Sequence, residues 1–116
     1  MKKLSALLMC VAVMVMSGCS RENLSDDTVY MFYQTSCPHC HDAEKYIMEK
    51  YPNLAISGKD IKYPGNRRLF EDALQKYKIT GAAGTPLILL GKHYIMGWSS
   101  EKAVQFDAYV KPFLAE

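Results

Sequence analysis

Two cysteines three residues apart are the side chains of this chain best placed for chemistry. They bracket the string Cys37-Pro38-His39-Cys40. Residues at this spacing are neighbours on one face of a helix, so the two thiols are close enough to form a disulfide. At a helix N-terminus, unpaired N–H groups and the helix dipole stabilise a thiolate, and the thiol pKa falls from about 8.5 to about 3.5–7.5. The spacing therefore predicts a redox pair with Cys37 as nucleophile and Cys40 as resolving thiol.

The two residues between the cysteines fit this interpretation. Pro38 is compatible with the first turn of a helix, where its missing N–H costs nothing. His39 can add a hydrogen bond or a positive charge that stabilises the Cys37 thiolate. Any group that favours the reduced form makes the disulfide a stronger oxidant. We therefore predict that His39 raises the reduction potential of the pair.

The segments on either side of the pair predict a strand followed by a helix. Residues 28–33 form a continuous β-branched and aromatic run, as expected of a strand buried on both faces. After Pro38, apolar side chains recur at helical spacing and stop at Pro52. The members of that stripe are Ala43, Tyr46, Ile47 and Tyr51.

The next part of the chain predicts a weaker strand and a second helix. Residues 54–58 form the strand, which residues 59–61 could extend. Residues 63–65 predict a turn, and Asn66 is a candidate N-cap. The helix that follows carries one apolar stripe, made of Leu69, Phe70, Ala73, Leu74 and Tyr77.

The last third predicts a hairpin and a final helix. Residues 87–90 and 93–96 flank Gly91-Lys92, which supplies the turn. Ser99 or Ser100 then caps a helix with Ala103, Phe106 and Val110 on its apolar face. The order is strand, helix, strand, helix, strand, strand, helix, which predicts one mixed α/β domain whose sheet is covered by helices.

A strand, C-P-H-C opening a helix, and then Thr85-Pro86 before a further strand resemble the thioredoxin superfamily. Pro86 lies 46 residues beyond Cys40 and only 30 residues follow it, as in glutaredoxins. The resemblance implies a four-stranded mixed sheet with flanking helices, and a thiol–disulfide oxidoreductase. It also implies that Pro86 is cis beside the redox pair and excludes a metal from it, and that Thr85 offers its backbone to a substrate.

Glutathione as a co-substrate stays open, because two diagnostic positions depart from the glutaredoxin pattern. Gln34-Thr35-Ser36 stand where a basic residue is usual before the first cysteine. Gly97-Trp98-Ser99-Ser100 replace the usual glycine pair and acidic residue, although the two serines could hold a carboxylate at a helix N-terminus. Trp98 is either a core side chain or an aromatic that faces substrate. No cofactor is expected beyond the Cys37–Cys40 disulfide itself.

Two other functions use the same cluster. C-x-x-C-H, which includes His41, is also the attachment signature of c-type haem, with Met96 or His93 as a second axial ligand. A metal module would use both cysteines with His39 or His41, but a closed site needs a fourth ligand, and no metal is expected. In the redox interpretation, His41 is a solvated first-turn side chain.

The N-terminus predicts export. Lys2 and Lys3 precede an apolar run over residues 4–16, shorter than the roughly 20 residues that span a bilayer and typical of a signal peptide. Ser17-Gly18-Cys19 resembles a bacterial lipoprotein signal, which implies cleavage before Cys19 and its diacylation. A plain secretory peptide and an uncleaved anchor are the alternatives. The expected division is a signal over 1–18, a lipidated tether over 19–27 and the domain over 28–116.

Cleavage would remove two of the 14 basic residues and none of the 12 acidic ones, which leaves a neutral chain. The excess positive charge belongs to the signal, so no nucleic-acid partner is expected. The expected protein is a monomer anchored by lipid outside the cytoplasm, on a periplasmic or extracellular face. Its expected partners are protein thiols and disulfides, and a membrane or soluble redox protein that returns the cysteine pair to its starting oxidation state. Whether it oxidises or reduces them is not encoded in the motif.

Overall fold

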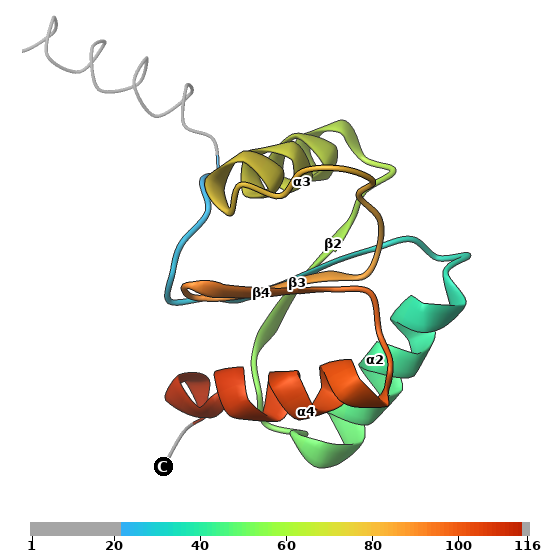
Figure 1. Cartoon of the computed structure of the whole chain (residues 1–116), viewed down its shortest axis with the longest axis vertical. Coiled ribbons are helices and arrows are strands. Elements are labelled where there is room, and N and C mark those ends of the chain that lie inside the picture. The colour runs from blue at the N-terminus through green and yellow to red at the C-terminus, as the bar shows by residue number, and fades with distance from the viewer. Residues whose placement is uncertain (1–21, 115–116) are drawn as a thin grey trace, which may run out of the picture.

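A computed structural model describes residues 22–114 of the chain (Figure 1). The predicted signal over residues 1–18 and the predicted lipidation site, Cys19, lie outside the described residues. Within residues 22–114, no helix is long and apolar enough to cross a membrane. The elements are β1 (Val29–Tyr33), α2 (Pro38–Lys50), β2 (Ile56–Asp60), α3 (Pro64–Lys76), β3 (Leu87–Leu90), β4 (His93–Met96), α4 (Ser100–Tyr109) and a 3-10 turn (Lys111–Phe113).

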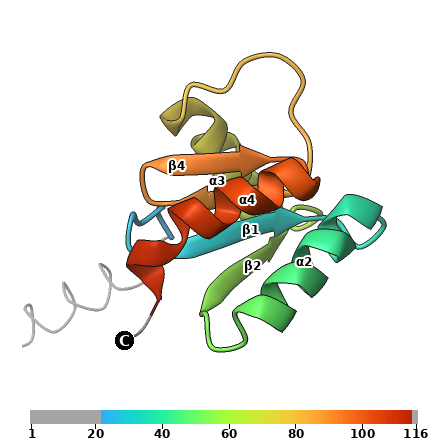
Figure 2. The same cartoon turned by 60° about the horizontal axis from the view of Figure 1, so that its bottom comes forward.

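The four strands form one mixed sheet in the order β2-β1-β3-β4. β1 pairs in parallel with β2, and the two other pairings are antiparallel. Helix α3 covers one face of the sheet, and α2 and α4 cover the other (Figures 1 and 2). The predicted order of elements and the mixed sheet are therefore confirmed.

Burial explains why β1 is the centre of this arrangement. Four of its five side chains, from Val29 to Phe32, are at most 7% exposed. Alternate residues point to opposite faces. Val29 and Met31 pack in the core cluster that also holds Phe106 of α4, whereas Phe32 packs in the cluster that holds Leu69 of α3. A strand buried on both faces was predicted from its unbroken apolar run.

Two predicted boundaries are wrong. β2 begins at Ile56 rather than at residue 54, because the Leu54 N–H instead donates to the Tyr51 carbonyl in a turn that closes α2. Helix α3 begins at Pro64, and Tyr63 is its N-cap. Asn66 lies inside the first turn, where its side-chain amide donates to the Asp60 carbonyl at 3.0 Å. Proline at the first helical position starts this helix earlier than the turn signal indicated.

The described part of the predicted tether is folded onto the domain. We call residues 22–27 the N-terminal strap. Leu24 packs against the core cluster under α3. Charged groups hold both ends of the strap: Glu22 pairs with Lys59 of β2 at 2.8 Å, and Asp26 pairs with Lys76 of α3 at 2.6 Å. Residues 22–27, which the sequence assigned to the tether, therefore pack against the domain over residues 28–114.

Candidate redox site

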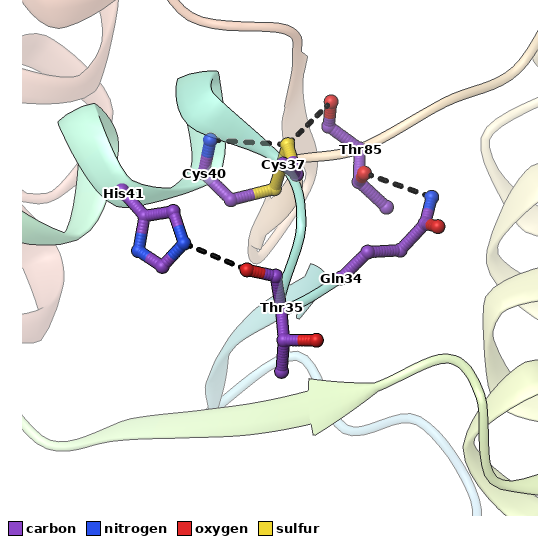
Figure 3. Close-up of a disulfide and its surroundings, with 6 residues drawn as sticks. All are labelled: Gln34, Thr35, Cys37, Cys40, His41 and Thr85. Atoms are coloured by element: carbon purple, nitrogen blue, oxygen red, sulfur yellow. Dashed lines mark hydrogen bonds between the residues drawn. A yellow bond between two sulfur atoms is a disulfide. The ribbon is translucent and has the colours of Figure 1, made fainter.

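Cys37 and Cys40 are joined by a disulfide at the start of α2 (Figure 3). Their Cα atoms are 5.2 Å apart, inside the range that a disulfide bridges. Cys37 is the N-cap residue of the helix, and its Sγ accepts a hydrogen bond from the Cys40 N–H at 3.1 Å. Cys40 is only 3% exposed, whereas Cys37 is half-buried. Cys37 is therefore the more accessible sulfur of the pair, and its role as nucleophile stays a prediction.

Thr85 and Pro86 lie against the first cysteine. The peptide bond between them is cis, as the resemblance implied. The Thr85 carbonyl oxygen is 3.6 Å from Cys37 Sγ, and the Pro86 carbonyl accepts a hydrogen bond from the Gly97 N–H at 2.8 Å. β3 begins at the next residue, Leu87. The start of β3 and the bond from Gly97 thus hold Thr85 and Pro86 beside the disulfide. Thr85 lies on the side of Cys37 that faces away from α2 (Figure 3).

The loop between β1 and Cys37, residues 34–36, is exposed but fixed by side chains on both sides (Figure 3). Gln34 Nε2 donates to Thr85 Oγ1 at 3.3 Å. The His41 Nε2 atom lies 2.8 Å from the Thr35 carbonyl oxygen. Gln34 therefore links the loop to the segment before Pro86, and His41 links it to the first turn of α2.

An apolar groove of about 510 Å³ runs between α2 and the edge strand β2. Its redox end is bordered by Cys40 and by Gln34, Thr35 and His41. The remaining wall is mainly apolar, and its side chains include Met31, Tyr33, Ile47, Met48, Tyr51, Leu54 and Ile56. Met48 on the rim is 64% exposed.

A second, shallower groove lies on the α4 side of the pair. His39 and Asp42 of α2 form one wall, and Trp98 and Ser99 form another. Trp98 packs against Tyr46 and Phe106, with ring centroids 5.6 and 6.1 Å away. Trp98 therefore packs on the core, as one of the two predicted interpretations has it, and it also lines the groove; a role in facing substrate stays a prediction. His39 is exposed in this groove and is not among the described hydrogen-bond partners of Cys37 Sγ.

A polar cluster fastens α4 to α2 next to this groove. The carboxylate of Asp107 accepts hydrogen bonds from Tyr46, Tyr51 and Lys50, at 2.8, 2.6 and 2.9 Å. Burial raises the pKa of Asp107, but the bonds from Tyr51, Lys50 and Tyr46 outweigh it and hold the pKa below its usual range. Burial and the bond to Asp107 raise the pKa of Tyr51 to about 12.

Sequence reasoning missed this cluster, and it missed the bond made by His41. Tyr46 and Tyr51 were predicted only as members of an apolar stripe. Their partner Asp107 stands 61 and 56 residues away in the sequence. His41 is exposed, as predicted, but its ring is bound to the loop. The one sequence signal for this contact was the position of His41 four residues after Cys37, because residues four apart share a helix face and the His41 ring therefore lies near the loop before Cys37.

The residues required for a haem or metal site are not brought together. His93 pairs with Leu90, and Leu90 pairs with Val29 at the start of β1. Because α2 follows the other end of β1, His93 lies at the end of the sheet far from the first turn of α2. Met96 packs in the core cluster on the α3 face. Within residues 22–114, no group of three or more His, Cys, Asp or Glu side chains is arranged to hold a metal ion.

A sheet of this order, with a cysteine pair opening the first helix and a cis proline beside it, has the thioredoxin-like α/β fold of the glutaredoxin type. The crystal structure of a buckwheat glutaredoxin–glutathione complex matches it with a TM-score of 0.53 at 20% sequence identity, over 74% of each chain. No family model matches the chain.

Curated relatives are similar in sequence as well. Mitochondrial glutaredoxin-2 from Pongo abelii and from Homo sapiens are each 35% identical to the chain over 94 residues, which is 81% of the chain. The protein from Mus musculus is 28% identical over the same length. These alignments cover 56%, 55% and 58% of the three relatives, so the chain spans little more than half of their length.

Proposed function

We propose that the chain is a thiol–disulfide oxidoreductase whose reactive sulfur is Cys37. The observation that carries this proposal is the position of Cys37 as N-cap of α2, where its Sγ accepts the Cys40 N–H bond. An N–H group and the positive end of the helix dipole stabilise negative charge on that sulfur. The similarity to three glutaredoxins supports the same activity.

The reaction follows from the two sulfurs. In the reduced protein, the Cys37 thiolate attacks one sulfur of a substrate disulfide, which forms a mixed disulfide and releases the other sulfur as a thiolate. The Cys40 thiolate then attacks Cys37 Sγ, which closes the internal disulfide and releases the reduced substrate. Two electrons pass to the substrate. Run in reverse, the same steps oxidise a substrate dithiol.

The substrates are thiols and their disulfides, and we propose those of proteins as the principal class. The buckwheat protein was crystallised with glutathione, and Ser99 borders the groove beside His39. Gln34, however, is neutral and is bonded to Thr85, so it supplies no charge for a glutathione carboxylate. Glutathione is therefore proposed as a second, weaker substrate.

We also propose that Cys19 carries a lipid anchor outside the cytoplasm. Two contacts hold Glu22 on the domain. Its carboxylate pairs with Lys59, and its backbone carbonyl accepts a hydrogen bond from the Arg68 guanidinium at 3.2 Å. Glu22 stands three positions after Cys19, and a chain of that length reaches at most about 10 Å. The strap leads to the start of β1, opposite the connection from β1 to α2 (Figures 1 and 2). A Cys19→Ser variant should leave the membrane fraction, and its retention there would contradict the anchor.

The experiment that tests the activity is the equilibrium reduction potential of the purified chain, titrated against glutathione buffers and read by thiol alkylation. A value near about −120 mV would mark an oxidant of protein thiols, and a value near about −270 mV would mark a reductant. Absence of any two-electron exchange would contradict the proposal.

A further inference from the structure

The three-residue loop before Cys37 has little burial to hold it. Gln34, Thr35 and Ser36 are all exposed. Its fixed shape therefore depends on hydrogen bonds. One of them is local, from the Cys37 N–H to the Gln34 carbonyl at 3.2 Å. The other two are the bonds through the side chains of Gln34 and His41 (Figure 3).

The chemistry of the His41 contact fixes its direction. A carbonyl oxygen only accepts hydrogen bonds, so His41 Nε2 carries the proton and donates to the Thr35 carbonyl. Both the neutral Nε2–H tautomer and the imidazolium make this bond. His41 stands four residues after Cys37 on α2, so its ring reaches back past the helix start to the loop. The bond closes a loop of chain that contains both cysteines.

What this closed loop holds is the backbone of Cys37. Cys37 has the extended conformation of an N-cap residue, with φ of −98° and ψ of 108°. That conformation brings its Sγ to the Cys40 N–H. When the disulfide is reduced, the covalent link between the two sulfurs is lost. The hydrogen bonds of the loop then remain to keep the Cys37 sulfur over the start of the helix.

We propose that His41 is a positioning residue for thiol–disulfide exchange, which donates from Nε2 to the Thr35 carbonyl and so keeps Cys37 Sγ at the N-terminus of α2. This inference rests on the proposed oxidoreductase function and assigns a part in it to a side chain that does not touch the sulfur. Loss of the bond lets the loop move in the reduced protein. The Cys37 sulfur then accepts hydrogen bonds from the helix N–H groups for a smaller fraction of the time. Its thiolate therefore forms less readily and reacts more slowly.

The test uses three variants of the full chain. His41→Leu removes the donor, whereas His41→Gln keeps an amide N–H at nearly the reach of Nε2. His93→Leu is the matched control, because it removes another exposed histidine, at the far end of the sheet, where its ring stacks on Tyr109. The readouts are the rate of Cys37 alkylation against pH in the reduced protein, and the free energy of unfolding.

We expect His41→Leu to slow alkylation at neutral pH roughly 2- to 12-fold and to move its pH midpoint upward, the size expected for one hydrogen bond. His41→Gln should stay within about 2-fold of the original protein, and His93→Leu should match it. If His41→Leu does not fold, His41→Asn replaces it, because the shorter amide falls short of Thr35, and the same loss is expected.

Two results would overturn the inference. One is a His41→Leu profile equal to that of the original chain. The other is an equal loss in His41→Leu and His41→Gln, which would assign the effect to the charge or bulk of the imidazole instead of the donated bond. These outcomes are distinct from failure of the proposed function. In that case the unsubstituted chain itself would exchange no disulfide, whatever residue stands at position 41.

Discussion

The backbone N–H of Cys40 donates to the sulfur of Cys37 at 3.1 Å, so the first cysteine caps the helix that carries the second. Serine, threonine, aspartate and asparagine usually take this position, because their oxygens satisfy an N–H group that has no partner within the helix. A sulfur that occupies it gains the same donor. The two cysteines are therefore unequal, and each has its own expected behaviour when replaced.

Replacement of Cys40 by serine should stop the reaction halfway. The Cys37 thiolate still attacks a substrate disulfide, but no second thiol is present to release it. We expect the mixed disulfide to accumulate to one equivalent, as measured by intact mass. Cys37→Ser should reduce exchange to the rate without protein and trap nothing, because Cys40 is only 3% exposed. Trapping through Cys40 in that variant would reverse the assignment of the two thiols.

Gln34 offers a test of substrate choice. A lysine there places a positive charge beside the disulfide, and glutathione is an anion. We expect Gln34→Lys to raise the rate with glutathione by roughly 2- to 5-fold, the size of an exposed ion pair. Gln34→Met, which is similar in length but neutral, is the control and should give no gain. The gain should fade at high salt. Equal rates in both variants would show that charge at this position does not limit glutathione use.

The parts of the fold that sequence predicted well are those fixed by local side-chain pattern. The run from Val29 to Phe32, the helix opened by Pro38 and the turn at Gly91 each follow from types of residue that favour one structure. Gly91, for example, has a φ of +66°, which a glycine adopts without strain. The redox pair and Thr85-Pro86 were found because their sequence strings are distinctive.

The missed features depend on partners that the local sequence does not reveal. β2 contains Gly58, a residue type with low strand propensity, and the position of the strand is set by backbone pairing with β1. His41 bonds to a backbone carbonyl, and any residue at position 35 offers one. The strap is polar, so it resembled a tether. Its ion pairs join groups 37 and 50 residues apart in the sequence.

The strap should contribute to stability through Leu24. This side chain is partly buried against the cluster under α3. Truncation to alanine removes part of that contact, and we expect Leu24→Ala to lower the free energy of unfolding in urea by about 1–2 kcal/mol. Asn23→Ala, at an exposed neighbouring position, should change it by less than about 0.5 kcal/mol. An unchanged Leu24→Ala variant would mean that the strap is a tether after all.

Asp107 links stability to pH, because it is the common acceptor of the cluster that fastens α4 to α2. It receives bonds from Tyr46, Tyr51 and Lys50, and its pKa is lower in the folded chain than the usual value of 3.8. A carboxyl with a lowered pKa adds stability above its unfolded pKa and loses it as the pH falls through the folded one. The Asp107 contribution is therefore complete at neutral pH, begins to fall below about pH 4, and is gone only below the lowered pKa of the folded chain.

Asp107→Asn should accordingly lower the free energy of unfolding at pH 7 by roughly 1–3 kcal/mol, because three donors lose a charged acceptor. As the pH falls from about 4 through the lowered pKa of the folded chain, the carboxyl of the original chain becomes protonated, so the unfolding free energies of the two proteins should approach each other. Urea unfolding at a series of pH values measures both effects. Asp42→Asn is the control, because Asp42 is an exposed aspartate of α2. Its free energy of unfolding should change with pH in the same way as that of the original chain. A constant difference between Asp107→Asn and the original chain at every pH would show that the carboxylate charge contributes nothing and that the cluster acts only through packing.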